Sequence, residues 1–246
     1  LSNSTGVTFH DGDLYFSEVD SIWKIPNIDL ALKQTDEIPM KILVTNNLPS
    51  DTWHGWKWIK FGPDDMLYVP VGAPCNICNP SLEEKYNFDK RYASIMRLNN
   101  DDWEYVARGV RNTVGFDWHP ETNKLYFGDN GRDWMGDDMP SCELNVVINE
   151  GSFYGYPYKH SMNVLDPDYS NKIPDDAEEF IDPILELGAH VAPTGLSFYN
   201  SDHFPAKYKN TLFMTLHGSW NRSRKVGYKV IACLLYTSDA ADDNAG

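Results

Sequence analysis

A strand–turn–strand pattern that recurs four times restricts the fold of this chain more than any other feature. Residues 6–16 read GVTFHDGDLYF: an apolar strand, a polar turn and a second strand with Leu-Tyr. The same order returns, with Leu-Tyr or Leu-Phe in the second strand, at residues 58–69, 115–127 and 195–214. The leucines of the second strands lie 53, 58 and 87 residues apart. A four-stranded propeller blade takes roughly 40–50 residues, so the first two spacings fit a blade with its loop. The third fits a blade with a polar insertion, which residues 159–179 supply.

The remaining pattern favours an all-β fold. Helical signals are confined to residues 28–33 and 81–91, and Gly, Pro, Asn and Asp separate the strands at even spacing. Aromatic residues make up 13% of the chain, which suits strands. We therefore predict a β-propeller of four-stranded blades. Four blades can form a complete ring, but the first hairpin begins at residue 6 with nothing before it to close one, so we expect a fragment of a larger propeller.

The composition argues against two classes of protein, and it leaves open the state of the cysteines and the origin of the C-terminal segment. A net charge of −15 argues against binding to nucleic acid, and no apolar run approaches the roughly 20 residues of a membrane span. A single C-x-x-C, Cys75 and Cys78, is weak evidence for zinc and favours a short disulfide, with free thiols as the alternative. The segment CLLYTSDAADD resembles translated adapter sequence, so we assign residues 1–232 to the partial propeller and set 233–246 aside.

Residues 105–157 carry more polar groups than hairpins need. The pair Arg111-Asn112 precedes a strand, and the loop 129–138 after the next strand is rich in Gly and Asp. Arginine presents a planar fork of donors for carboxylate or quinone oxygens. Carboxylates and backbone carbonyls beside glycine can bind Ca²⁺, although a solvated acidic loop explains the composition equally well. The candidate carboxylates are Asp129, Asp133, Asp137, Asp138 and Glu143.

One histidine of seven stands out as a candidate base. His54 lies between Trp53 and Trp56 directly before a strand, and aromatic walls would keep its imidazole neutral. His190 and His217 lie at strand edges and are weaker candidates. We expect His10 and His119, each in a hairpin turn, on the surface. His203 lies in a loop with no evident role, and His160 lies in the insertion.

Four segments in the expected order resemble the glucose/sorbosone dehydrogenase family. The longest starts at ARGVRNTVGFDWHPETNKLYFGDNGRDW and continues to GSFYGYPY; the others are WHGWKWIKFGPDDMLYVPVGAPCNIC, HVAPTGLSFY and HGSWNRSRKVGY. More closely, the chain resembles the branch of sorbosone-dehydrogenase-like proteins that use pyrroloquinoline quinone (PQQ). The resemblance implies a six-bladed propeller with PQQ and Ca²⁺ at one end of the central channel.

The resemblance also assigns roles. His54 matches the base that takes the hydroxyl proton, Arg111 and Asn112 match the pair that contacts the quinone, and the backbone carbonyls of Gly131 and Arg132 match the calcium ligands. Asp137 or Asp138 matches a carboxylate near the base, and Arg222 is a looser match to a basic cofactor contact. One departure is Cys142 in CELN, where the family commonly has a carboxylate.

The implied activity is PQQ- and calcium-dependent oxidation of a small-molecule sugar or related alcohol or aldose, with an electron acceptor, in the periplasm or outside the cell. Two alternatives stay open. A calcium-dependent propeller lactonase would need carboxylate and amide ligands from several blades, and here the acidic residues concentrate in one loop. A binding propeller without catalysis would have no need of His54 together with Arg111 and Asn112.

Overall fold

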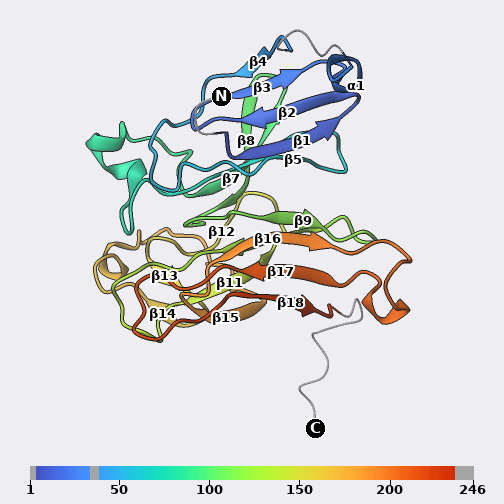
Figure 1. The fold of residues 1–246 in the computed structure, drawn as a ribbon. Helices are drawn as coiled ribbons and strands as arrows, with labels where there is room; N and C mark the ends of the chain where they lie inside the picture. The colour runs from blue at the N-terminus through green and yellow to red at the C-terminus, as the bar shows by residue number, and fades with distance from the viewer. Residues whose placement is uncertain (1–3, 34–38, 236–246) are drawn as a thin grey trace.

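The computed structural model describes residues 4–33 and 39–235, and nearly all its regular structure is β-strand (Figure 1). Four sheets follow one another along the chain, and their main strands are antiparallel neighbours in chain order. The first sheet contains β1 (Gly6–His10), β2 (Asp13–Ser17), β3 (Ile22–Ile25) and β4 (Ile42–Thr45). The second contains β5 (Lys60–Phe61), β6 (Leu67–Val71), β7 (Ser94–Asn99) and β8 (Asp102–Arg108). The third contains β9 (Phe116–Trp118), β10 (Leu125–Asp129), β11 (Ser141–Val146) and β15 (Leu185–Ala189), and the fourth β16 (Pro193–Phe198), β17 (Leu212–Leu216) and β18 (Lys229–Cys233).

The predicted fold is confirmed. The four sequence repeats are the hairpins β1–β2, β5–β6, β9–β10 and β16–β17, which are the first two strands of each sheet. The helical signals become α1 (Ile28–Ala31) and the 3-10 turns η1 (Pro80–Leu82) and η2 (Glu84–Tyr86). No helix in the described part of the chain is both long and apolar enough to cross a membrane.

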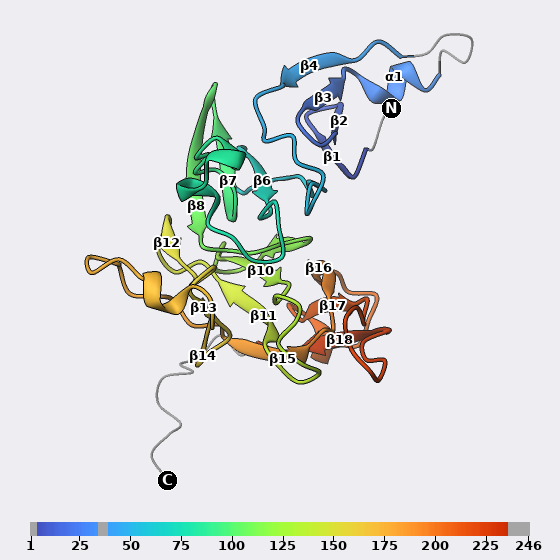
Figure 2. The ribbon, with the colours of Figure 1, turned by 90° about the vertical axis from the view of Figure 1, so that its left-hand side faces the viewer.

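The sheets are arranged as propeller blades around a common centre, with the first and fourth at the two ends of the arc (Figure 2). Apolar clusters fill the space between successive blades, and the central strands β6 and β11 of the two middle blades bury side chains on both of their faces. Burying a large aliphatic or aromatic side chain contributes roughly 1.5–3 kcal/mol. The three clusters include Ile22 and Val69, Ile95 and Phe116, and Leu144 and Met214, none more than 1% exposed.

The inner strands approach one another closely and share a buried carboxylate. Asp117 on β9 accepts hydrogen bonds from Lys60 Nζ on β5 at 2.6 Å and from the Phe198 N–H on β16 at 2.8 Å, so it links three blades. Gly115 lies where a β-carbon would fall 2.0 Å from the Thr194 carbonyl oxygen. Only glycine permits this approach of β9 to β16.

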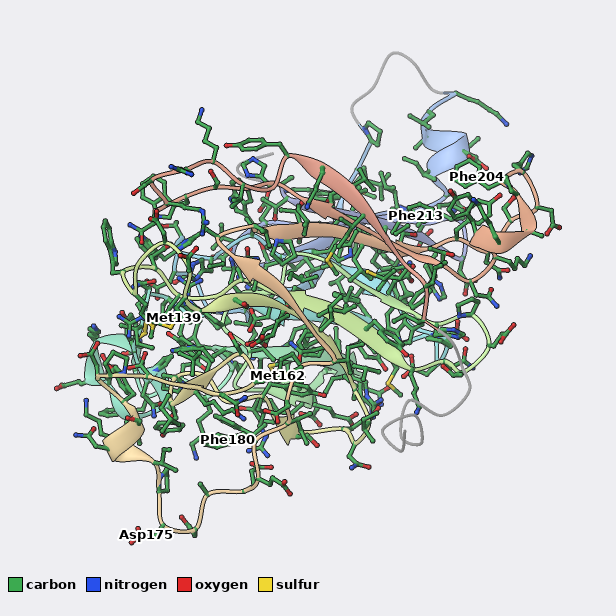
Figure 3. All side chains as sticks on the ribbon, turned by 90° about the horizontal axis from the view of Figure 1, so that it is seen from below. Met139, Met162, Asp175, Phe180, Phe204 and Phe213 are labelled. Carbon is green, nitrogen blue, oxygen red and sulfur yellow. A yellow bond between two sulfur atoms is a disulfide. The ribbon has the colours of Figure 1, made fainter. Side chains whose placement is uncertain are left out.

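The predicted insertion lies between β11 and β15 and extends outward, with Asp175 at its tip (Figure 3). It contains the hairpin β13 (Lys159–His160) and β14 (Val164–Leu165) and the turn η3 (Ser170–Lys172). Just before it, β12 (Ser152–Phe153) pairs parallel with β8 and adds a fifth strand to the second blade. The insertion is therefore joined to two blades.

One expectation about the histidines is wrong. His119 is only 1% exposed, although its hairpin turn suggested the surface. Its ring packs against Phe198 of the fourth blade at 5.0 Å between ring centroids, and its Nδ1 accepts the Glu121 N–H at 3.2 Å. His10 is half-buried and stacks on Phe61. The hairpin pattern could not show that the next blades cover these turns.

Around the fourth blade the loop between β16 and β17 contains η4 (Ala206–Tyr208) and an aromatic cluster. Phe204 and Phe213 lie close together there, with ring centroids 6.2 Å apart (Figure 3). His203 is exposed in the same loop and its Nδ1 lies 2.7 Å from Ser201 Oγ, within hydrogen-bond distance.

Candidate active site

Loops from all four blades meet at one pocket of about 150 Å³. His54 comes from the segment between β4 and β5, and Arg111 from the segment between β8 and β9. Trp220 comes from the segment after β17. The other residues that line the pocket are Asn112, Asn130, Gly131, Asp133, Cys142, His190 and Ala192. Sequence positions as far apart as 54 and 220 thus share a single site.

His54 is held as a neutral imidazole with one nitrogen free. Its Nδ1 lies 2.7 Å from the Ala73 carbonyl oxygen, a contact that requires a proton on Nδ1 and leaves a lone pair on Nε2. Burial, reinforced by the positive charge of Arg111, lowers the pKa of His54 to about 3. Gly72 makes room for this ring, because a β-carbon there would lie 2.6 Å from His54 Cβ.

Arg111 directs a buried guanidinium into the pocket. Its Nε donates to the Asn76 carbonyl at 2.9 Å, one terminal nitrogen donates to Asn76 Oδ1 at 2.9 Å, and the other to the Asn130 carbonyl at 3.1 Å. An arginine has five N–H donors, so two remain for a ligand. The side-chain amide of Asn112, the neighbouring residue, makes no hydrogen bond within residues 4–33 and 39–235, whereas its backbone N–H donates to Asp129.

Asp129, at the end of β10, fixes the backbone of this pair. Its carboxylate accepts the N–H of Arg111 at 2.8 Å and of Asn112 at 2.6 Å. Burial raises its pKa to about 6 despite these bonds. Glu143 is its register partner on β11, and burial together with the negative charge of Asp129 raises the pKa of Glu143 to about 8. Burial and the repulsion between the two carboxylates both favour a protonated form of the pair.

The loop after β10 offers the carbonyls of Gly131 and Arg132. Neither oxygen accepts a hydrogen bond from any residue that the structure describes. The Arg132 side chain is 6% exposed and donates to Asp166 of the insertion at 2.5 Å. His160 holds Asp166 at 2.8 Å from the other side, so the insertion anchors this loop. His160 is thus a buried structural partner, which its place in a polar stretch did not indicate.

Asp133 and His190 form a second polar pair on the pocket wall. Asp133 Oδ1 lies 3.7 Å from His190 Nδ1, and its Oδ2 lies 4.0 Å from an Arg111 terminal nitrogen. Burial raises the pKa of Asp133, with Arg111 and His190 opposing the shift. His190 Nε2 lies 2.8 Å from the Gly136 carbonyl, which orients the ring with Nδ1 toward Asp133.

Asp137 and Arg222 line a neighbouring hollow of about 510 Å³, apart from His54, and Asp138 contacts Arg222 beside it. Arg222 donates to the Asp137 carbonyl and to Asp138 Oδ1, the latter at 3.0 Å. The Ser223 N–H donates to Asp137 Oδ1 at 3.0 Å. The three side chains therefore mainly tie the third blade to the fourth. His217 is outside the pocket, and its Nδ1 lies 2.6 Å from the Gly218 carbonyl.

Part of the strained backbone lies around the pocket. Non-glycine residues with positive φ are uncommon, and they are found at functional sites where the surrounding structure can hold them. Of the 16 such residues in the described part of the chain, five line the pocket or adjoin a residue that does: His54 (φ 48), Trp134 (φ 70), His190 (φ 61), Ala192 (φ 50) and Asn221 (φ 55).

Sequence reasoning underrated three residues of the site. Asn76 lies inside the C-x-x-C, and a disulfide does join Cys75 and Cys78, as predicted. Asp133 was one carboxylate among five, and Trp220 lies in the motif HGSWNRS without a distinguishing signal. Of these three residues, only Asn76 has a sequence signal that could have identified it, because a residue between two disulfide-bonded cysteines is held rigidly.

The model of the family described as TrAA12-like matches residues 3–244. The chain belongs to the TrAA12-like family. An uncharacterized protein of Borreliella burgdorferi is 38% identical over 239 residues, which cover 94% of this chain and 61% of that protein. The chain thus spans about three fifths of the length of this relative.

Solved structures share the fold. A calcium structure of the Trichoderma reesei carbohydrate-active enzyme of family AA12 matches with a TM-score of 0.69 and 21% identity, covering 92% of this chain and 64% of that one. The holo form of the PQQ domain of pyranose dehydrogenase from Coprinopsis cinerea matches with a TM-score of 0.69 and 18% identity, covering 92% and 63%. These likenesses establish the propeller fold.

Proposed function

We propose that this chain is part of a PQQ- and calcium-dependent oxidoreductase that oxidises a sugar or a related alcohol or aldose. The observation that carries the proposal is that His54, Arg111 and Gly131 line one pocket. His54 keeps a lone pair on Nε2, Arg111 keeps two N–H donors, and Gly131 is followed directly by Arg132, the second residue with an unpartnered carbonyl among the described residues. The family and the pyranose dehydrogenase neighbour support the same reading.

The residues present fit the cofactor and its metal. PQQ is a planar, anionic quinone, and Arg111 and Asn112 offer it N–H donors that no other described residue occupies. Hard cations such as Ca²⁺ prefer oxygen ligands, and the unpartnered carbonyls of Gly131 and Arg132 supply two. No three His, Cys, Asp or Glu side chains in the described ranges cluster to hold a metal, so a cation here would depend on backbone oxygens and the cofactor. When bound, PQQ supplies a quinone carbon that accepts a hydride.

His54 then acts on the substrate. Its Nε2 accepts the proton of the substrate hydroxyl, while the Ala73 carbonyl keeps the ring oriented through Nδ1. A pKa of about 3 makes His54 a weak base in the ligand-free pocket. A carboxylate bound to Arg111 would offset the positive charge that contributes to this shift, so the pKa of His54 should rise on cofactor binding. Arg111 also stabilises negative charge that develops on a bound quinone oxygen.

We assign the acidic position beside the base to Asp133 rather than to Asp137 or Asp138. Asp133 lines the pocket and lies near both Arg111 and His190. Asp137 and Asp138 do not line it: Ser223 donates to Asp137 and Arg222 donates to Asp138. For the same reason we regard Arg222 as a residue that ties two blades together, and its cofactor contact stays a prediction from resemblance.

The test uses the full-length protein reconstituted with PQQ and Ca²⁺. We expect dye reduction with at least one aldose from a panel, and a loss of about 10²–10⁴-fold in kcat/KM for His54→Gln. The matched control is His203→Gln, an exposed histidine in a distant loop, which should retain wild-type activity. Absence of dye reduction by protein that binds the cofactor would refute the proposal, and lactone hydrolysis that persists without PQQ would favour the lactonase.

A further inference from the structure

The loop closed by the Cys75–Cys78 disulfide contacts Arg111 and Asp133 of the pocket through one residue, Asn76. Asn76, between the two cysteines, accepts from Arg111 twice: at its carbonyl oxygen from Nε and at its Oδ1 from a terminal nitrogen, both at 2.9 Å. Its Oδ1 also accepts the Asp133 N–H at 2.8 Å, and its Nδ2 donates to the Asp133 carbonyl at 3.1 Å. Four hydrogen bonds therefore run from Asn76 to Arg111 and Asp133.

The loop is itself fixed by covalent and buried contacts. The disulfide closes a ring with only two residues between its cysteines. Behind it, the hydroxyl of Tyr156, a residue only 3% exposed, accepts the Cys78 N–H at 3.1 Å and lies 3.4 Å from Cys75 Sγ. A short cross-linked loop has few conformations open to it, so Asn76 is presented to its partners with little loss of entropy on binding them.

We propose that Asn76 is a positioning residue for Arg111 and Asp133, and that the Cys75–Cys78 disulfide holds it in place, so that reduction of the disulfide weakens cofactor binding. This inference rests on the proposed function. A guanidinium held at two of its nitrogens has a fixed plane, and a planar fork binds a planar anion well only when that plane is correct. Asn76 touches neither cofactor nor substrate in this scheme and acts through its two partners.

The first experiment measures PQQ affinity in Ca²⁺ by calorimetric titration. Asn76→Ala should weaken the affinity about tenfold to a hundredfold, because it removes one charge-assisted hydrogen bond and frees Asp133. Asn76→Asp keeps the oxygen acceptor for Arg111 but loses the Nδ2 donor to the Asp133 carbonyl, so it should recover only part of the affinity that Asn76→Ala loses. Asn171→Ala, at an exposed asparagine in η3, is the matched control and should leave the affinity unchanged. Equal affinity of Asn76→Ala and wild type would overturn the inference.

A double-mutant cycle separates positioning from general stability. Lysine at position 111 cannot use the two acceptors of Asn76 as a fork, so Asn76→Ala in the Arg111→Lys background should cost less than about threefold. The same loss in both backgrounds would mean that Asn76 acts independently of Arg111, and would refute the inference. The double variant Cys75→Ser/Cys78→Ser and dithiol reduction of the wild type should each reproduce the loss seen for Asn76→Ala. Thermal melting confirms that every variant is folded.

A cofactor-free measurement keeps this inference apart from the proposed function. The Arg111 Nε–H donates to Asn76 within a buried cluster, so its proton should exchange slowly in arginine-selective ¹⁵N NMR spectra, where Arg111→Lys identifies it. The cysteine variant, which releases the loop, should speed that exchange at least about tenfold. Asn76→Ala keeps the carbonyl that accepts this proton and loses only the Oδ1 contact to the guanidinium, so it should speed the exchange by a smaller factor. If wild-type protein binds no PQQ, the proposed function fails, but the exchange measurement still tests the role of Asn76. Unchanged exchange in both variants would refute the inference that Asn76 and the disulfide position Arg111.

Discussion

Replacing Glu143 with glutamine tests the electrostatics beneath the pocket without using any ligand. Glu143 is 8% exposed and accepts the Ser161 N–H at 2.6 Å and the Asn145 amide at 3.0 Å. Asp129 is its register partner and accepts the backbone N–H groups of Arg111 and Asn112. Glutamine imitates the protonated acid in shape and cannot ionise. The variant therefore removes the cost of ionising this side chain. Its Nε2 cannot accept the Asn145 amide, so one hydrogen bond is also lost, but that loss does not change with pH.

The magnitude follows from the shift in pKa. Burial and the charge of Asp129 raise the pKa of Glu143 from 4.5 to about 8. Below pH 4.5 the group is protonated in both the folded and the unfolded chain and costs nothing. Between 4.5 and about 8 the unfolded chain ionises first, so the free energy of unfolding falls as pH rises, and above 8 the cost is complete. A shift of this size corresponds to about 5 kcal/mol, an upper bound because the titration is shared with Asp129.

The assay is urea unfolding of wild type and Glu143→Gln from pH 5 to pH 9 in the presence of a chelator. We expect the variant to gain roughly 3–5 kcal/mol relative to wild type across that range, with most of the change between pH 5 and 8. Glu179→Gln, at an exposed position, should follow the wild-type curve. Parallel curves for wild type and Glu143→Gln would refute the reasoning, because they would mean that Glu143 ionises as easily folded as unfolded.

Three further predictions concern the loop and the base. Asp166→Asn should destabilise the protein by about 3 kcal/mol in urea unfolding, because it leaves the buried Arg132 guanidinium without its main partner; an unchanged midpoint would contradict this. The imidazole resonance that disappears in His54→Gln should titrate near pH 3 in NMR spectra of the ligand-free protein, and a midpoint between 5 and 8 would mean that the ring is not desolvated. Chelation of calcium should abolish PQQ binding and added Ca²⁺ should restore it, whereas binding that survives chelation would argue against the carbonyls of Gly131 and Arg132 as ligands.

The parts of the fold that were predictable depend on local pattern. Each repeat pairs neighbouring strands through a short turn, and turn chemistry and alternation of apolar residues are properties of adjacent residues. The disulfide between Cys75 and Cys78 was predictable for the same reason, since only two residues separate its partners. The fifth strand of the second blade was not, because β12 reaches β8 only after the chain has built β9, β10 and β11.

In the candidate site, too, adjacent residues indicated some features, and contacts with distant segments set the others. Flanking residues pointed to His54 as a neutral base, but the Ala73 carbonyl that orients it and the Arg111 charge that lowers its pKa come from other segments. Five carboxylates with similar sequence surroundings have different roles in the structure. Asp129 holds two backbone N–H groups, Asp133 lines the pocket, and Asp137 and Asp138 meet Arg222.

The sequence by itself determined an all-β chain of four repeated hairpins and the residue types, at His54 and Arg111-Asn112, that mark a site. Only the tertiary structure decided which carboxylate faces the pocket, that His119 and His160 are buried, and that Asn76 grips Arg111. The physical reason is that pairing within a blade is encoded by adjacent residues. Burial, charge and hydrogen bonding at the pocket are set by loops from different blades, whose distances exist only once the blades have packed.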